Sequence, residues 1–244
     1  MSLPGPALLS GAIAATWPAA AAWRLGPWTI RDGAGGGKRT SAATAEAAVG
    51  AGDLPAAETA MRALGMAPLF MIREGEDGLD RLLAARGYAE VDPVNMHAAP
   101  VALLTRRTPP PVSTFCIWEP LAIMADIWTA GGIGPDRRAV MHRVKGPRTG
   151  LLGRAENQPA AAAFAAIHDG IAMVHALEVR PHLRRHGMGR HVMCQAAHWA
   201  RARGATSIAA VCTRDNMAAN ALYTSLGMTV VGTYHYRQDR KGAP

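Results

Sequence analysis

The chain has 244 residues, of which 49% are apolar and 18% are charged. This composition can bury a core, so it excludes a chain that is disordered by composition. The formal net charge is +8, which favours anionic partners but does not distinguish nucleic acid, a membrane surface and a phosphorylated small molecule. The three cysteines, Cys116, Cys194 and Cys212, are isolated from one another, so the sequence predicts neither a disulfide framework nor a metal site.

The N-terminal segment, residues 1–23, is apolar but has no basic leader, and Pro4, Pro6 and Pro18 interrupt it too early for a membrane span. Apolar residues recur in this segment at helical spacing, which predicts an amphipathic helix. These residues are Leu8, Leu9, Ile13 and Trp17. We therefore expect a cytoplasmic protein that does not contact a membrane.

A Gly-rich stretch follows. We expect a β-hairpin with a strand over residues 28–31, a mobile turn over 33–37 and a return strand over 39–43. The letters GGGK in the turn do not form a phosphate-binding P-loop, because the leading glycine spacing is absent and Lys38 is not directly followed by Ser or Thr.

Two segments of the chain resemble each other. Residues 70–91 read as strand, turn, helix, Gly-aromatic and strand, and residues 210–231 have the same order. We interpret this match as a tandem duplication. Three consecutive prolines near residue 110 exclude a helix interior or a central strand there. We therefore expect a first half (1–105), a proline linker (106–112) and a second half (113–244).

The second half has clearer patterns. Helices are expected over residues 121–129 and 137–144, followed by strands over 149–154, 160–167 and 171–179, a helix over 189–203, a strand over 207–212, a helix over 217–226 and a final strand pair over 229–236.

A basic loop joins the strand that ends at Val179 to the helix that begins near Gly189. Gly187 and Gly189 lack a Cβ and allow a ligand to approach the backbone. The first N–H groups of a helix have no partner within the helix, and the helix dipole adds partial positive charge. Arg184, Arg185 and Arg190 add full charges. This composition describes a pyrophosphate cradle, with a solvated basic turn as the alternative.

The pattern Arg184-x-x-Gly187-x-Gly189 resembles the R/Q-x-x-G-x-G/A signature of the GNAT superfamily of N-acetyltransferases. The downstream stretch NMAANALYTSLGM resembles the second signature of that family, with Asn216 and Tyr223 in register. A Rossmann dinucleotide site does not fit, because its third glycine would fall on Val192. The resemblance implies a mixed α/β GNAT acyl-CoA N-acyltransferase fold, and the repeated order extends this expectation to two GNAT-like halves.

The resemblance also implies that acetyl-CoA is the cosubstrate. Its pyrophosphate would be held by the backbone of the loop, with the Arg184 side chain supporting that loop. The residues assigned to cofactor binding are Leu177, Val179, Arg184, Arg185, His186, Gly187, Met188, Gly189, Arg190 and Asn216. Both signatures lie after the linker, so we expect the second half alone to bind acetyl-CoA.

Tyr223 occupies the family's usual position for the general acid, which would protonate the leaving thiolate. Glu178, at the end of the strand, is the candidate general base, with His175, His235 and ordered water as alternatives. Strand alternation places His175 and Glu178 on opposite faces unless the strand bulges. The residues His191, Gln195 and His198 share helical spacing but have no carboxylate nearby in sequence, so we expect a solvated helix face rather than a metal site.

The function we expect is an N-acetyltransferase that moves an acetyl group from acetyl-CoA to a primary amine of a small molecule or peptide by direct attack. The alternative is a catalytically silent module that senses CoA. Nucleic acid is not an expected partner, because aromatic residues are not interleaved with Lys and Arg. At the repeat offset, Leu83 stands in the position of Tyr223, so we expect a degenerate first half that shapes the acceptor pocket. The acceptor and the oligomeric state stay open.

Overall fold

The computed structural model describes residues 2–239. Its first half contains α1 (Pro6–Thr16), β1 (Ala21–Leu25), β2 (Trp28–Asp32), α2 (Lys38–Ser41), β3 (Thr44–Ala45), α3 (Leu54–Ala63), β4 (Leu69–Arg73), α4 (Asp77–Ala85), β5 (Tyr88–Pro100) and α5 (Val101–Leu104). The second half contains β6 (Thr114–Ile117), α6 (Ala122–Ala130), α7 (Pro135–Arg143), β7 (Arg148–Ala155), β8 (Gln158–His168), β9 (Ile171–Val179), α8 (Met188–Arg201), β10 (Ser207–Thr213), α9 (Met217–Ser225) and β11 (Thr229–Asp239). The mixed α/β class is confirmed, and each helix expected in the second half is present.

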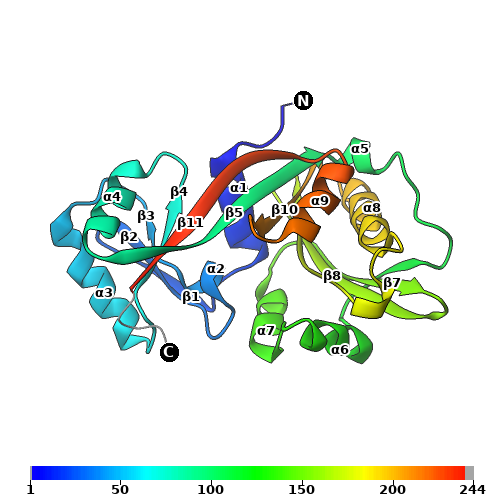
Figure 1. Cartoon of the computed structure of the whole chain (residues 1–244), viewed down its shortest axis with the longest axis horizontal. Helices are drawn as coiled ribbons and strands as arrows, with labels where there is room; N and C mark the ends of the chain where they lie inside the picture. Colours follow the sequence, from blue (N-terminus) through cyan, green and yellow to red (C-terminus); the bar gives the residue numbers. More distant parts are fainter. Residues whose placement is uncertain (1, 240–244) are drawn as a thin grey trace.

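A mixed eight-stranded sheet runs through the molecule in the order β4-β11-β5-β10-β9-β8-β7-β6, and β1, β2 and β3 form a smaller separate sheet (Figure 1). Strand β5 belongs to the first half but lies between β10 and β11 of the second half. Helix α8 covers one face of the second-half strands, while α6 and α7 cover the other. The large sheet therefore contains strands from both sides of the expected boundary, and the division into two domains stays a prediction.

The final strand pair expected over residues 229–236 is wrong. One continuous strand, β11, replaces it, and this strand pairs antiparallel with β5 and with β4. Two irregularities in the register with β5 bend β11 along its length. The strand therefore finds its partners in the first half rather than in a neighbouring hairpin strand.

The hairpin predicted over residues 28–43 is also wrong in part, because its return strand is not formed by residues 39–43. Strand β2 pairs with β1, which precedes it, across a turn at Gly26 and Pro27. Gly26 has a φ of +55°, which favours glycine. The expected return strand is instead the short helix α2, where the Thr40 hydroxyl donates to the Gly37 carbonyl at 2.8 Å. The glycine turn is packed against the second half, because a side chain on Gly35 would collide with Asp136 of α7.

Helix α1 is confirmed, but its buried side differs from the expected one. Leu9 and Ile13 are buried, and Trp17 is buried just after the helix, whereas Leu8 is 62% exposed. The buried residues Ala12 and Thr16 complete the inner face. This face contacts β8 and β9, so the first helix of the chain covers strands of the second half. Within residues 2–239, no helix has the length and hydropathy needed to cross a membrane.

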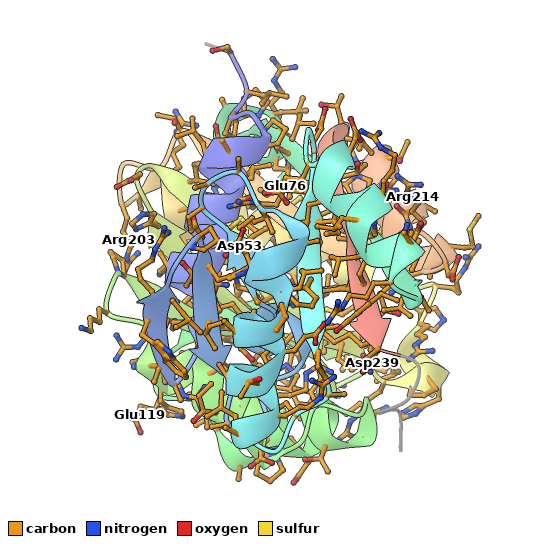
Figure 2. All side chains as sticks on the ribbon, turned by 90° about the vertical axis from the view of Figure 1, so that its left-hand side faces the viewer. Asp53, Glu76, Glu119, Arg203, Arg214 and Asp239 are labelled. Atoms are coloured by element: carbon orange, nitrogen blue, oxygen red, sulfur yellow. The ribbon has the colours of Figure 1, made fainter. Side chains whose placement is uncertain are left out.

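The proline linker runs beside α8, the helix expected to have a solvated face. The ring of His198 lies 3.1 Å from the Arg107 carbonyl oxygen, and the Thr114 hydroxyl donates to Gln195 at 3.2 Å. This face of α8 therefore holds the linker and β6 rather than facing only solvent. At the opposite end of the molecule (Figure 2), the end of β11 is attached to α3 through an ion pair of 3.1 Å between Asp239 and Arg62.

Candidate active site

The central feature of the site is a gap between β9 and β10. These strands are parallel, and they pair only where Ile171–Val174 of β9 lie beside Ser207–Ala210 of β10. Beyond this point β9 continues along β8, and β10 continues along β5. The backbone N–H and C=O groups on the facing edges therefore have no partner across the gap, and an extended polar ligand can pair with them.

A β-bulge in β9 lies at the point where the strands separate. Phe164 of β8 is opposite His175, but Ala162 is opposite Glu178, so β9 has one extra residue between them. Ala176 adopts a positive φ of 51°, and its carbonyl accepts a hydrogen bond from the Trp128 indole at 2.8 Å. The extra residue turns His175 and Glu178 to the same face of the sheet, which simple alternation forbids.

The loop after β9 is held by Arg184. Its Nε donates to the Val179 carbonyl at 3.0 Å, and its terminal nitrogen donates to the Glu178 carboxylate at 2.9 Å. This guanidinium therefore fixes the loop to the end of β9. His186 in the same loop pairs with Glu156 of the β7–β8 turn at 3.3 Å.

The start of α8 has the geometry of an anion site. Arg185 and Gly187 have left-handed φ values of 71° and 78°, and α8 begins directly after them at Met188. Within the described part of the chain, the N–H groups of residues 185–190 make no backbone hydrogen bond. The first turn of α8 contains no acidic residue. These N–H groups and the helix dipole therefore favour an anion, and Arg185 and Arg190 add charge.

The two glycines of this loop have different structural roles. Gly187 is needed for its left-handed backbone, since an added Cβ would meet nothing closer than the His191 ring at 3.8 Å. Gly189 is needed for packing, because its Cβ would lie 3.0 Å from Leu222 of α9. The sequence pattern predicted both glycines but assigned both of them to close approach of a ligand.

Tyr223 lies in α9 on the side of the sheet covered by α8. It is 5% exposed, and its ring packs at 5.1 Å from the His97 ring of β5. Burial raises the pKa of Tyr223, so the phenol is protonated at neutral pH. Asn216 accepts a hydrogen bond from the Ala219 N–H at 3.0 Å and so caps the N-terminus of α9.

The three candidates for the general base have different surroundings. Glu178 is paired with Arg184, and its side chain is 21% exposed. His235 is paired with Asp80 of α4 at 2.7 Å, where β11 runs along β4. His235 therefore fastens α4 to the sheet and lies outside the gap.

His175 is buried, and both ring nitrogens have partners. Its Nε2 lies 2.9 Å from the Thr16 hydroxyl, which itself donates to the Ala12 carbonyl at 2.6 Å, so His175 donates to Thr16. Its Nδ1 then accepts from Arg39 at 3.2 Å. Burial, reinforced by Arg39, holds the pKa of His175 well below its usual value. His175 is therefore neutral and has no free lone pair with which to act as a base.

A cavity of about 320 Å³ adjoins the open part of β10. Residues from the first half that line it include Trp17 and Arg39, and residues from the second half include Arg137 and Cys212. Sequence reasoning missed Arg39 and the His97 ring beside Tyr223. No signal in the chain joins them to the signatures, since both residues lie far upstream, before the proline linker.

Comparison with known proteins places this geometry in a family. Residues 122–228 match the model of the acetyltransferase (GNAT) family. A curated relative, the uncharacterized N-acetyltransferase YobR of Bacillus subtilis (strain 168), is 26% identical over 236 residues, which cover 93% of this chain and 96% of the relative. Residues 122–228 therefore match the GNAT family of acetyltransferases, the family that the two signatures resemble.

Solved structures agree on the fold. A GCN5-related N-acetyltransferase from Kribbella flavida has a TM-score of 0.72 at 21% identity, with 96% of this chain and 95% of that chain covered. A tandem GNAT protein from the clavulanic acid biosynthesis pathway has a TM-score of 0.62 at 14% identity, with 89% and 78% covered. The GNAT acyltransferase fold is therefore confirmed, while a duplication within this chain stays a prediction.

Proposed function

We propose that the protein transfers the acetyl group of acetyl-CoA to a primary amine of a small molecule or peptide by direct attack of the amine on the thioester. The observation that carries this proposal is the gap between β9 and β10. One edge of this gap continues into the basic loop at residues 184–190, and the other edge lines the cavity.

The residues around the gap fit acetyl-CoA, which supplies an activated acetyl thioester when it is bound. The unpaired β9 edge near Leu177 and Val179 suits the amide groups of the pantetheine arm. The free N–H groups of residues 185–190 suit the pyrophosphate. Asn216, at the start of α9, keeps its side-chain amide nitrogen for a further hydrogen bond.

Tyr223 is the proposed general acid. Burial raises the pKa of Tyr223, so the phenol is protonated at neutral pH and has a proton to donate to the departing thiolate. Glu178 or ordered water is proposed to take the proton of the attacking amine. Tyr223 and Glu178 lie toward opposite faces of the sheet, so donor and acceptor sides of the reaction are separated.

Cys212 supports direct attack over an acyl-enzyme route. Its thiol lines the cavity at the open end of β10, where a covalent intermediate would have to form. Burial raises the pKa of Cys212 to about 11, so only about one thiol in ten thousand is a thiolate at pH 7. Cys212 is therefore a poor nucleophile.

Calorimetry with acetyl-CoA and a screen of amines for CoA release test the proposal together. We expect binding of acetyl-CoA and release of free CoA with at least one class of amine. Binding without release by any amine would favour the alternative, a catalytically silent CoA sensor. Absence of acetyl-CoA binding would reject both functions.

A further inference from the structure

The cavity beside β10 lies on the opposite side of the sheet from the basic loop. Its lining residues Val94, Tyr234 and Tyr236 pack in the apolar cluster around α1, whereas the residues of α8 pack in the cluster on the other face. A molecule in this cavity therefore approaches the gap from the side away from the loop that we assign to the pyrophosphate. In the proposed reaction this is the side from which the acceptor amine arrives.

Two arginines in this cavity have no carboxylate partner among residues 2–239. Arg39 donates to His175 at 3.2 Å, and its guanidinium lies 5.4 Å from the centre of the Trp17 ring. The Nε of Arg137 is buried and has no hydrogen-bond partner. Burial and the nearby Arg39 both lower the pKa of Arg137. Two guanidinium groups are thus held close together without a counter-ion, which costs free energy that an anion between them would recover.

The other charges of the cavity do not neutralise this pair. Asp92 is the acidic residue among the lining residues, and it is already bound to Lys38 at 2.7 Å. Lys38 and Asp92 cancel each other, so the cavity retains the two positive charges of Arg39 and Arg137. The excess charge is therefore concentrated at one place and not spread over the lining.

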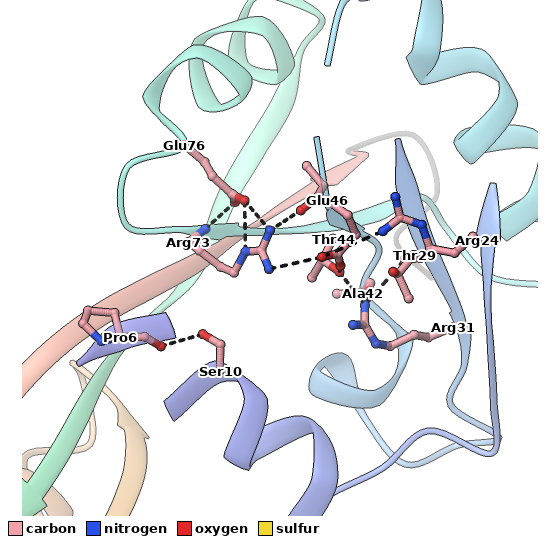
Figure 3. A network of polar contacts seen from close by, with 11 residues as sticks. Pro6, Ser10, Arg24, Thr29, Arg31, Ala42, Thr44, Glu46, Arg73 and Glu76 are labelled. Carbon is pink, nitrogen blue, oxygen red and sulfur yellow. Dashed lines mark hydrogen bonds and ion pairs between the residues drawn. The ribbon is translucent and has the colours of Figure 1, made fainter. Parts of the chain in front are cut away.

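A neighbouring cavity provides a contrast. It shares Trp17, Arg39 and Tyr234 with the first cavity, and it also contains Arg31 and Arg73. These two arginines are fully engaged (Figure 3). Arg31 donates to Thr44 at 3.0 Å and to the Ala42 carbonyl at 2.9 Å, and Arg73 is paired with Glu76 at 2.6 Å. The fold therefore satisfies nearby arginines with its own acceptors, whereas Arg39 and Arg137 have no carboxylate partner in the part of the chain that the structure describes.

We infer that the acceptor carries an oxyanion, a carboxylate or a phosphate, in addition to its amine, and that Arg39 and Arg137 hold this oxyanion in the cavity. A guanidinium fork matches both groups with two parallel hydrogen bonds. The oxyanion would anchor the acceptor beside β10 and leave its amine free to reach the gap. This inference rests on the proposed function, because it concerns the acceptor of that reaction.

The test compares matched amines that differ in the anionic group. The pairs are L-phenylalanine with phenethylamine, L-lysine with cadaverine, and phosphoethanolamine with ethanolamine. Each is titrated by calorimetry into the full-length protein, with and without saturating CoA. We expect the anionic member of at least one pair to bind at least tenfold more tightly, which corresponds to about 1.4 kcal/mol. The first two pairs report on a carboxylate and the third on a phosphate.

Variants identify the groups that carry the preference. Arg137→Gln should reduce the preference for the anionic amine at least tenfold. It should leave the dissociation constant for acetyl-CoA within twofold of that of the unmodified protein. Arg138→Gln is the matched control, because Arg138 lies on the same helix but donates to Thr129 at 2.7 Å. The control also removes one positive charge from α7. It should change neither the preference for the anionic amine nor the dissociation constant for acetyl-CoA. Arg39→Gln should act like Arg137→Gln if its melting temperature shows that the contact with His175 is dispensable.

The outcomes separate this inference from the proposed function. Equal binding within every pair, undetectable binding of all anionic probes at millimolar concentration, or a preference that survives Arg137→Gln would overturn the anion site. If the unmodified protein does not bind acetyl-CoA but still prefers the anionic amines, the proposed function is overturned and the anion site stays in place.

Discussion

At the scale of single residues, Tyr223 combines burial, a raised pKa and a position on α9 beside the gap. The variant Tyr223→Phe removes only the hydroxyl and keeps the ring against His97. If the phenol donates a proton to the departing thiolate, kcat should fall about 100-fold while KM for acetyl-CoA stays within twofold. Steady-state kinetics and a melting curve on the same variant measure both effects.

Tyr88→Phe is a matched control for this experiment. The Tyr88 hydroxyl donates to Glu58 at 2.9 Å in the first half, where it has no contact with the gap. Its removal should cost about 1 kcal/mol of stability and leave kcat unchanged. A Tyr223→Phe variant that behaves like this control, with reduced stability and full activity, would assign Tyr223 to packing.

The sequence predicted the residues near the gap where they lie within its two signatures or on the strand directly before the first signature. The loop at residues 184–190 and Tyr223 are close in sequence to the strands that position them, so their pattern was readable. Arg39 and His97 come from other parts of the chain, and only the folded sheet brings them to His175 and Tyr223. A single sequence carries no record of such long-range contacts.

At the scale of elements, the junction between β9 and α8 depends on the backbone of Gly187. A non-glycine residue at its φ of +78° costs about 1–2 kcal/mol, and a branched side chain would also crowd the N–H groups at the helix start. We expect Gly187→Val to weaken acetyl-CoA binding at least tenfold, measured by calorimetry.

The other end of α8 provides the control for this variant. Gly204 follows the helix with a φ of +80°, and an added Cβ would meet nothing within 4 Å. Gly204→Val should therefore impose a similar backbone strain, and a similar drop in melting temperature, without changing acetyl-CoA affinity. Equal losses of affinity in both variants would mean that strain in α8, and not the anion site, explains the effect.

Helix α4 is attached to β11 through Asp80, which gives the fold a defined response to acid. Hydrogen bonds from Arg237 and His235 lower the pKa of Asp80 from 3.8 to about 2, against the opposing effect of burial. The folded state therefore binds this proton more weakly than the unfolded state. The contribution of Asp80 to stability is full above pH 4 and disappears as the pH falls to about 2.

Asp80→Asn tests this response. Urea unfolding at several pH values should show a loss of stability at pH 7 that shrinks steadily between pH 4 and pH 2. Asp77→Asn, which changes an exposed residue of the same helix, is the control and should cost less stability at pH 7 than Asp80→Asn. If Asp80→Asn lowers the free energy of unfolding by the same amount at every pH, the attachment of α4 is not ionic in origin.

Element prediction succeeded where the signal was local and failed where the partner was distant. The helices and strands between residues 121 and 226 follow from periodicity and turn residues close to them. The return strand expected over residues 39–43 is displaced, because α2 occupies most of these residues and the short strand β3 (Thr44–Ala45) pairs with β2 instead. The last strand was read as a pair because its true partner, β5, lies far upstream.

At the scale of the whole molecule, β5 changes the expectation that the second half binds acetyl-CoA alone. This strand pairs with β10 along Ser207–Thr213 and with β11 over most of its length. A fragment that begins at residue 113 would expose the edges of both strands and lose the cover of α1 over β8 and β9. The two halves therefore depend on each other for the geometry of the gap.

Cleavage of the linker tests this dependence. A protease site inserted within residues 106–112 should be cut without separating the pieces, because β5 stays hydrogen-bonded between β10 and β11. Size-exclusion chromatography should show one species of unchanged size in buffer and two species in urea, and the cut protein should bind acetyl-CoA as tightly as the intact chain. The fragment 113–244 expressed alone should aggregate or fail to bind. Separation of the pieces in buffer, or tight binding by the isolated fragment, would instead establish the second half as an independent domain.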